Sequence, residues 1–288
     1  MKPAHLFLLL LVLASSAYVV YLDAYRGLAY VAMGLALAAV SYVVYYKRLE
    51  FLAAGSTHAA LFAAVVGLLA EHYTGVSYLA FSLPAGLSLV YAAGFMVKKG
   101  SSPGKAAAVV VSAASALAVL SAHYVFARVP ARVSLSALIL GDPLLLTRSE
   151  ALVATVVSAA LVSAALAARR VVVELSVDPV SVELAGVKAG LYELASYTLV
   201  GVAAVGLLRL AGYVMEHVLL LLPAIAASAY SSSTREHMLL TLLLGAFSAS
   251  LGYVVGVVFN TVPTGASGLL LIGALLLRYL MGWVRSGR

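Results

Sequence analysis

Residues 27–46 read GLAYVAMGLALAAVSYVVYY and contain no charged side chain, although Arg26 precedes them and Lys47 follows. A helix of about twenty apolar residues is long enough to cross the hydrocarbon core of a bilayer. The stretch therefore predicts a transmembrane helix with a basic residue at each end.

The rest of the chain repeats this pattern. Of its 288 residues, 64% are hydrophobic and only 10% are charged, and its mean hydropathy is +1.08. So few charges cannot cover a soluble globule, and the ten-residue alternation of membrane β-barrels is absent. Short polar breaks separate ten apolar windows, at 4–22, 27–46, 51–70, 76–97, 106–127, 150–168, 189–211, 213–230, 237–259 and 266–284. We predict an all-α polytopic transmembrane bundle of about ten spans, a single domain over residues 1–288.

The basic residues indicate how these spans are oriented. If the N-terminus is cytoplasmic and all ten windows cross, twelve Lys and Arg residues fall inside and four fall outside. The inner set is Lys2, Lys47, Arg48, Lys98, Lys99, Lys105, Arg169, Arg170, Lys188, Arg235, Arg285 and Arg288, and the outer set is Arg26, Arg128, Arg132 and Arg148. The positive-inside rule favours this arrangement, so we expect a cell-membrane protein with both termini in the cytoplasm. The net charge of +7 is spread over several loops and offers no clustered face for nucleic acid.

Three ionisable side chains, His58, Glu216 and His217, lie inside windows that are otherwise apolar. A charged group at membrane depth costs several kcal/mol unless it has a partner or a polar cavity, so such residues are functional candidates. Imidazole and carboxylate groups bind divalent transition metals, and we take these three as candidate metal residues. In the alternative interpretation, Arg209 neutralises Glu216 as a buried ion pair seven residues along the same helix.

Glu216 and His217 are adjacent in sequence, and this limits whether they can share one metal site. Glu216 and His217 point about 100° apart on a regular helix, so both can bind one ion only if the helix is broken nearby. Gly212 and Pro223 are the candidate points for such a break.

Familiar catalytic motifs are absent from the sequence. The chain has no cysteine, which excludes thiolate sites and disulfides. Its adjacent Glu and His residues never form HExxH, and no phosphate-binding GxxxxGK[ST] loop occurs. We therefore expect a transport subunit and not an enzyme, with any ATP hydrolysis on a separate chain.

Several motifs occur in a fixed order along the chain. They are Arg48-Leu49 followed by FLAAGSTHAA at 51–60, LILGDPL at 138–144, Asp178-Pro179 followed by Gly186-Val187-Lys188, LLPAIAA at 221–227 and PTGA at 263–266. From about residue 30 to 280, this set resembles the membrane permeases of zinc and manganese ABC importers. The resemblance implies a type II-like permease fold and a homodimer with its path at the two-fold axis. It also implies cytoplasmic ABC ATPase subunits that bind ATP, an extracytoplasmic metal-binding protein, and Zn²⁺ or Mn²⁺ as cargo, with no covalently bound cofactor.

The chain departs from this family at the expected metal site. Many members carry an Asp four residues before the histidine, where this chain has Ala54, and another at the position of Thr261. The family's Ser or Thr and its apolar residue are here replaced by His217 and Glu216. We infer that part of the metal site has moved onto the segment that carries Glu216 and His217. Further candidate path residues are Asn260 and Asp142.

The cytoplasmic side carries the predicted ATPase contacts. Asp178 as N-cap and Pro179 as first helical residue predict a short helix over 180–188. Pro223 is predicted to break a span, and residues 231–234 offer N-caps for the next helix. As the resemblance implies, these elements touch the ATPase. The predicted coupling residues are Pro223, Thr234, Arg235, Glu236, His237 and Asp178.

The first span has no counterpart in the resemblance. We expect residues 1–24 to form an extra N-terminal span at the lipid-facing periphery, ahead of a permease core at 25–288. The rival function is an ATPase-independent secondary transporter or channel for cations. Such a protein would show internal repeats and helices broken at the membrane midplane.

Overall fold

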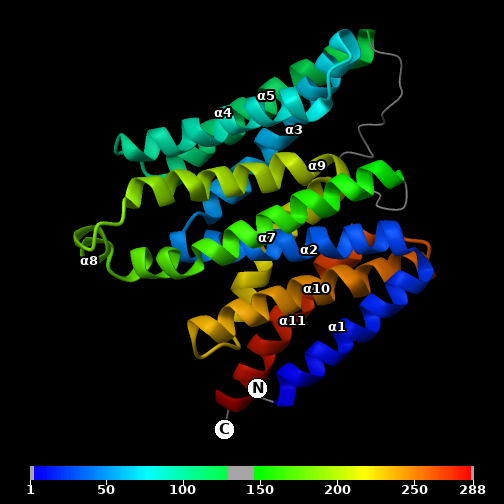
Figure 1. Ribbon diagram of the computed structural model, residues 1–288, viewed down its shortest axis with the longest axis vertical. Helices are drawn as coiled ribbons and strands as arrows, with labels where there is room; N and C mark the ends of the chain where they lie inside the picture. The colour runs from blue at the N-terminus through cyan, green and yellow to red at the C-terminus, as the bar shows by residue number, and fades with distance from the viewer. Residues whose placement is uncertain (1–2, 129–145, 287–288) are drawn as a thin grey trace.

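The computed structural model describes residues 3–128 and 146–286 of the chain. All regular structure within these ranges is helical, and ten segments are long and apolar enough to cross a membrane (Figure 1). The predicted all-α class and ten spans are therefore confirmed. The helices are α1 (Pro3–Leu22), α2 (Ala24–Lys47), α3 (Glu50–Thr74), α4 (Tyr78–Lys98), α5 (Pro103–Arg128), α7 (Arg148–Val177), α8 (Pro179–Leu184), α9 (Ala189–Ser228), α10 (Thr234–Val258) and α11 (Pro263–Ser286).

Polar side chains fix where several of these helices begin. The Asp23 carboxylate accepts the first free N–H groups of α2. Ser233 caps α10 by accepting the backbone N–H of Glu236 at 3.2 Å. Asp178 caps α8 as predicted and accepts the backbone N–H of Ser181 at 3.1 Å. Each cap satisfies a donor that the helix itself leaves unpaired.

Helix α2 lies at the centre of the bundle and packs against α7, α9 and α10 (Figure 1). Its crossing with α10 is close because small residues meet there. A Cβ atom on Gly34 would overlap the Cβ of Ala249 and lie 3.2 Å from the carbonyl oxygen of Gly245. A Cβ atom on Gly245 would overlap Ala38 in the same way. The two backbones touch, which is how helices associate tightly when lipid leaves no hydrophobic driving force between them.

The N-terminal helix α1 packs on the outside of α10 and α2, and most of its surface is exposed. Two polar contacts tie it to α10. The hydroxyl oxygens of Ser15 and Ser250 lie 2.6 Å apart, and Nε2 of His5 lies 3.2 Å from the carboxylate of Glu236.

The predicted break at Pro223 is wrong. Helix α9 continues through Pro223 to Ser228, and its non-helical backbone lies instead at Gly212. A proline removes one backbone N–H and leaves a carbonyl without its usual partner. The helix survives such a loss in a membrane when neighbouring helices supply hydrogen bonds.

Two side chains from neighbouring helices bond to the backbone beside Pro223. The hydroxyl of Ser41, on α2, lies 3.3 Å from the carbonyl oxygen of Leu221 and 3.3 Å from the backbone nitrogen of Ala224. Nε2 of His237, on α10, lies 2.8 Å from the carbonyl oxygen of Ala224. These bonds fasten the segment to α2 and α10, although none of them replaces the helical bond to the carbonyl of Leu219 that Pro223 removes.

The glycine crossing generates a stability prediction. Gly34→Ala and Gly245→Ala should each lower the melting temperature of the purified protein, since overpacking costs roughly 1–3 kcal/mol. Gly273→Ala in α11 is the matched control, because nothing lies within 4 Å of its added Cβ. There the better helix propensity of alanine, worth up to about 1 kcal/mol, should leave stability equal or higher. Unchanged melting of both crossing variants would contradict the close contact.

Candidate functional site

Two of the predicted metal residues meet around one tyrosine. Nε2 of His58, on α3, lies 3.4 Å from the hydroxyl of Tyr213, on α9. The Tyr213 ring stacks on the ring of His217, with centroids 5.9 Å apart and an interplanar angle of 18°. His58 meets the same tyrosine edge-on, with centroids 5.8 Å apart. The structure thus brings both imidazoles into contact with the same tyrosine ring.

A hydroxyl group forms a hydrogen bond with Nδ1 of each imidazole. Oγ of Ser115, on α5, lies 3.2 Å from Nδ1 of His58. Oγ1 of Thr57 lies 3.3 Å from Nδ1 of His217, and its own proton is donated to the carbonyl oxygen of Ala54 at 2.8 Å. Thr57 must therefore accept a hydrogen bond from Nδ1–H of His217.

This hydrogen bond fixes the tautomer of His217. A neutral imidazole that carries its proton on Nδ1 keeps a lone pair on Nε2. In other proteins, metal-binding histidines are oriented by a hydrogen bond on the ring nitrogen that does not bind the metal. The geometry leaves Nε2 of His217 able to act as a metal ligand.

Glu216 occupies a different environment from its neighbour. It is fully buried, while His217 is half-buried, and neither carboxylate oxygen has a hydrogen-bond partner among the described residues. The predicted ion pair with Arg209 involves a side chain that lies outside the described ones. Over the described ranges, no three His, Asp or Glu side chains are grouped so as to hold an ion. One protomer therefore joins two imidazoles but does not add Glu216 to them as a third ligand.

The predicted break at Gly212 is present and positions this cluster. Gly212 has φ 78° and ψ 157°, a conformation that side chains beyond glycine rarely adopt. A continuous helix over the length of α9 would measure about 60 Å, twice the hydrocarbon thickness. The non-helical backbone at Gly212 interrupts it between two apolar stretches that are each long enough to cross a membrane. Tyr213 and His217 lie just after the break, one turn apart on the same face.

The remaining predicted residues lie away from the cluster. Asn260 is exposed in the turn between α10 and α11, with φ 51°. Asp142 lies outside the described residues. Asp178, Thr234 and Arg235 are exposed at the starts of α8 and α10.

Two of the predicted coupling residues bond within the chain itself. The Glu236 carboxylate accepts the backbone N–H of Ser232 at 2.7 Å and the hydroxyl of the same residue at 2.6 Å. His237 is buried, donates from Nε2 to the carbonyl of Ala224, and accepts the hydroxyl of Tyr46 at Nδ1, 3.1 Å away. Both side chains hold the start of α10 in place.

Sequence reasoning missed the polar partners of the histidines. Tyr213 had a detectable signal, since it precedes His217 by four residues and so shares its helical face. Thr57 is adjacent to His58 in sequence, but its bond reaches His217 instead. Ser115 sits in an apolar window of its own and gives no sequence signal for its contact with His58.

Comparison with known proteins places this cluster in a transporter. Residues 24–282 match the family described as the ABC 3 transport family. The chain belongs to that family. The resemblance to the permeases of zinc and manganese ABC importers is thereby confirmed, and this chain is a metal-type ABC permease and a multi-pass membrane protein. Helix α1 precedes the matched residues. A search of curated proteins found no match to the chain.

Two solved structures have a similar fold. One is PsaBC from Streptococcus pneumoniae in complex with Fab, with a TM-score of 0.78 and 16% identity, covering 93% of this chain and 95% of that chain. The other, described as an inward-facing "metal-chelate type ABC transporter", has a TM-score of 0.72 and 17% identity, covering 96% of this chain and 100% of that chain. At such low identity the similarity concerns the fold, which is that of a type II-like ABC importer permease.

The break in α9 generates a second prediction. Gly212→Ala should lower the melting temperature, because a side chain in this backbone region costs roughly 1–3 kcal/mol. Gly206→Ala, in the helical part of α9, is the matched control, since its added Cβ would meet neighbours only at 3.8 Å or more. Equal melting temperatures for the two variants would show that Gly212 does not need its left-handed conformation.

Proposed function

We propose that this chain is the membrane permease subunit of an ATP-driven importer for Zn²⁺ or Mn²⁺. The observation that carries the proposal is the pair of imidazoles, His58 and His217, placed around Tyr213 at membrane depth in a metal-type ABC permease. Imidazole nitrogen favours Zn²⁺, whereas Mn²⁺ prefers oxygen ligands such as the carboxylate of Glu216.

The proposed working unit is a homodimer whose path lies on its two-fold axis. Both imidazoles are half-buried, so a surface beside them is open to a second copy. Two-fold symmetry would add the same two imidazoles from the partner, and four nitrogen ligands would result once Nε2 of each His58 exchanges its contact with Tyr213 for the ion. Four such ligands match the tetrahedral coordination of Zn²⁺.

The proposed partners follow from the two ends of the bundle. Two ABC ATPase subunits bind ATP at the cytoplasmic face, where α8 and the start of α10 present Asp178 and Thr234. Both chain termini lie on this side. An extracytoplasmic metal-binding protein delivers the ion to the opposite face.

One observation favours the rival function of an ATP-independent carrier. The break at Gly212 is the kind of discontinuity that secondary transporters use at their substrate sites. Membership of the ABC 3 transport family favours the importer instead. Metal uptake by proteoliposomes that contain this chain without an ATPase would support the carrier.

The imidazole pair generates a transport prediction. His58→Ala and His217→Ala should each reduce metal uptake by the assembled importer by more than about tenfold, because an apolar neighbour cannot replace a lost ligand. His72→Ala, at the exposed end of α3, is the matched control and should keep uptake near the wild-type level. Melting temperatures of all three variants separate a transport defect from unfolding. Wild-type uptake in both cluster variants would refute the proposed path.

The cap of α8 generates a coupling prediction. Hydrogen bonds from the Ser181 hydroxyl and backbone N–H hold the pKa of the Asp178 carboxyl below its usual range. The ionised cap is therefore complete at neutral pH, and it is lost only as the pH falls through this lowered pKa. Asp178→Ala should uncouple metal uptake from ATP hydrolysis, whereas Asp178→Ser should preserve coupling because serine is also a good N-cap.

Metal-stimulated ATP hydrolysis and uptake, measured together in the reconstituted complex, test this assignment. Tight coupling in Asp178→Ala would show that α8 does not transmit the ATPase movement.

A further inference from the structure

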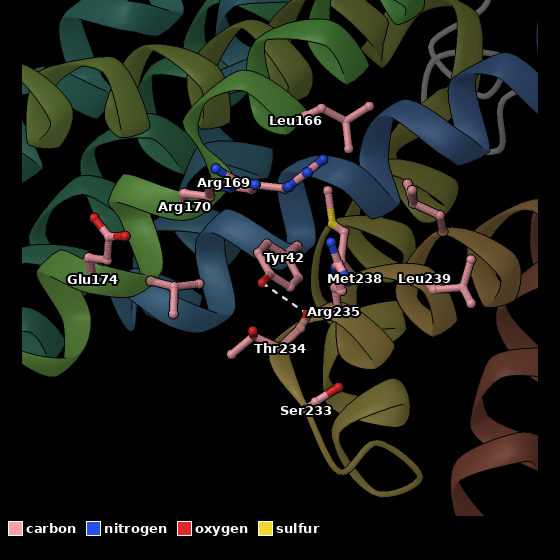
Figure 2. A pocket seen from close by; sticks show the side chains of 12 residues that line it. Tyr42, Leu166, Arg169, Arg170, Glu174, Ser233, Thr234, Arg235, Met238 and Leu239 are labelled. Atoms are coloured by element: carbon pink, nitrogen blue, oxygen red, sulfur yellow. Dashed lines mark hydrogen bonds between the residues drawn. The ribbon is translucent and has the colours of Figure 1, made fainter. Parts of the chain in front are cut away.

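A groove of about 610 Å³ opens between α2, α7 and α10 (Figure 2). The side chains of Arg169 and Arg170 reach it from α7, and that of Arg235 reaches it from α10. These arginines are far apart in sequence, and the fold brings them to one cavity. The imported metal ion is a cation, so a groove with three guanidinium groups is not part of its path.

The groove carries a net positive charge. Its single acidic residue is Glu174, one turn beyond Arg170 on α7. In the part of the chain that the structure describes, no carboxylate forms an ion pair with any of the three guanidinium groups. The hydroxyl of Tyr42, in the wall of the groove, donates to the carbonyl oxygen of Thr234 at 3.3 Å. The arginines therefore face the groove with their donors available to a ligand.

Apolar side chains line the membrane side of the same groove. Leu166 precedes Arg169 by one turn on α7, and Leu239 follows Arg235 by one turn on α10. Leu242 lies one turn deeper still on α10. The basic groups thus lie near the ends of the spans. The leucines lie further along the same helices, on the side of the hydrocarbon layer. A ligand that fills the groove must be anionic at one end and apolar at the other.

The length of α7 explains how the arginines come to face a groove. The hydropathy window ends at residue 168, but the helix continues to Val177 and carries Arg169, Arg170 and Glu174 on its last turns. Because the apolar stretch of this helix ends just before them, we expect them at the level where a bilayer changes from acyl chains to headgroups. A spread of basic residues in loops would satisfy the positive-inside rule without forming a cavity.

We propose that this groove binds one anionic phospholipid. Its phosphate lies on the guanidinium groups of Arg169, Arg170 and Arg235, and an acyl chain runs along Leu239 and Leu242. Arginine suits this role because its planar fork donates two hydrogen bonds to phosphate oxygens. Basic pockets between transmembrane helices are known sites for lipid headgroups. The site does not depend on which metal the permease carries.

Native mass spectrometry of the detergent-purified chain tests the proposal. Dioleoylphosphatidylglycerol should remain bound at an excess of dioleoylphosphatidylcholine. Each lost guanidinium should weaken binding roughly fivefold, so Arg169→Gln, Arg170→Gln and Arg235→Gln together should weaken it about a hundredfold. The matched control combines Lys98→Gln, Lys99→Gln and Lys105→Gln, which remove the same charge away from the groove, and it should change binding less than about twofold.

A second variant distinguishes loss of the lipid site from misfolding of the triple arginine variant. Leu242→Trp fills the apolar part of the groove and keeps every charge, so it should also reduce phosphatidylglycerol binding at an unchanged melting temperature. Equal losses in the arginine and lysine variants would overturn the site in favour of non-specific attraction. Full competition by millimolar glycerol 3-phosphate would overturn the lipid in favour of a soluble phosphate. Wild-type lipid binding with loss of the copurifying ATPase in the arginine variant would show that the groove is a protein contact.

Discussion

Backbone hydrogen bonding in hydrocarbon is the constraint on which this structure depends. No water is available to a peptide group at membrane depth, and an unpaired one costs several kcal/mol. Helices meet this demand along most of the chain, but Pro223 breaks the pattern by removing a donor. Ser41 and His237, on two neighbouring helices, bond to the backbone of Leu221 and Ala224 beside this proline. The resulting joint fixes α9 against α2 and α10, and it therefore shapes the bundle in which the imidazole cluster sits.

The cluster itself uses polar groups sparingly. His58 and His217 share Tyr213, and each has one hydroxyl on its inner nitrogen. Thr57, one turn after Ala54, donates to the backbone carbonyl of Ala54. A backbone oxygen thus holds the hydroxyl that orients His217.

The spans were predictable because hydrocarbon demands about twenty apolar residues, and Gly212 was predictable as a break because glycine alone suits its backbone. The prediction failed at Pro223, where the contacts that hold the helix come from Ser41 and His237, far away in sequence. The contact of Ser115 with His58 and the groove shared by Arg169 and Arg235 were also not predictable, because their partners are far apart in sequence. Hydropathy gives where a helix enters the bilayer, but it carries no information on which residues meet across helices.

The imidazole of His237 has a mechanical consequence. It bonds to Tyr46 on α2 and to the backbone of the second half of α9, while its own backbone belongs to α10. Together with the glycine contact between α2 and α10, these two hydrogen bonds join α2, α10 and the second half of α9 into one rigid block. A block of this kind resists bending within itself, whereas the non-helical backbone at Gly212 lies just outside these contacts. Gly212 is therefore the point of α9 where bending would strain the fewest of them, and it lies directly before Tyr213.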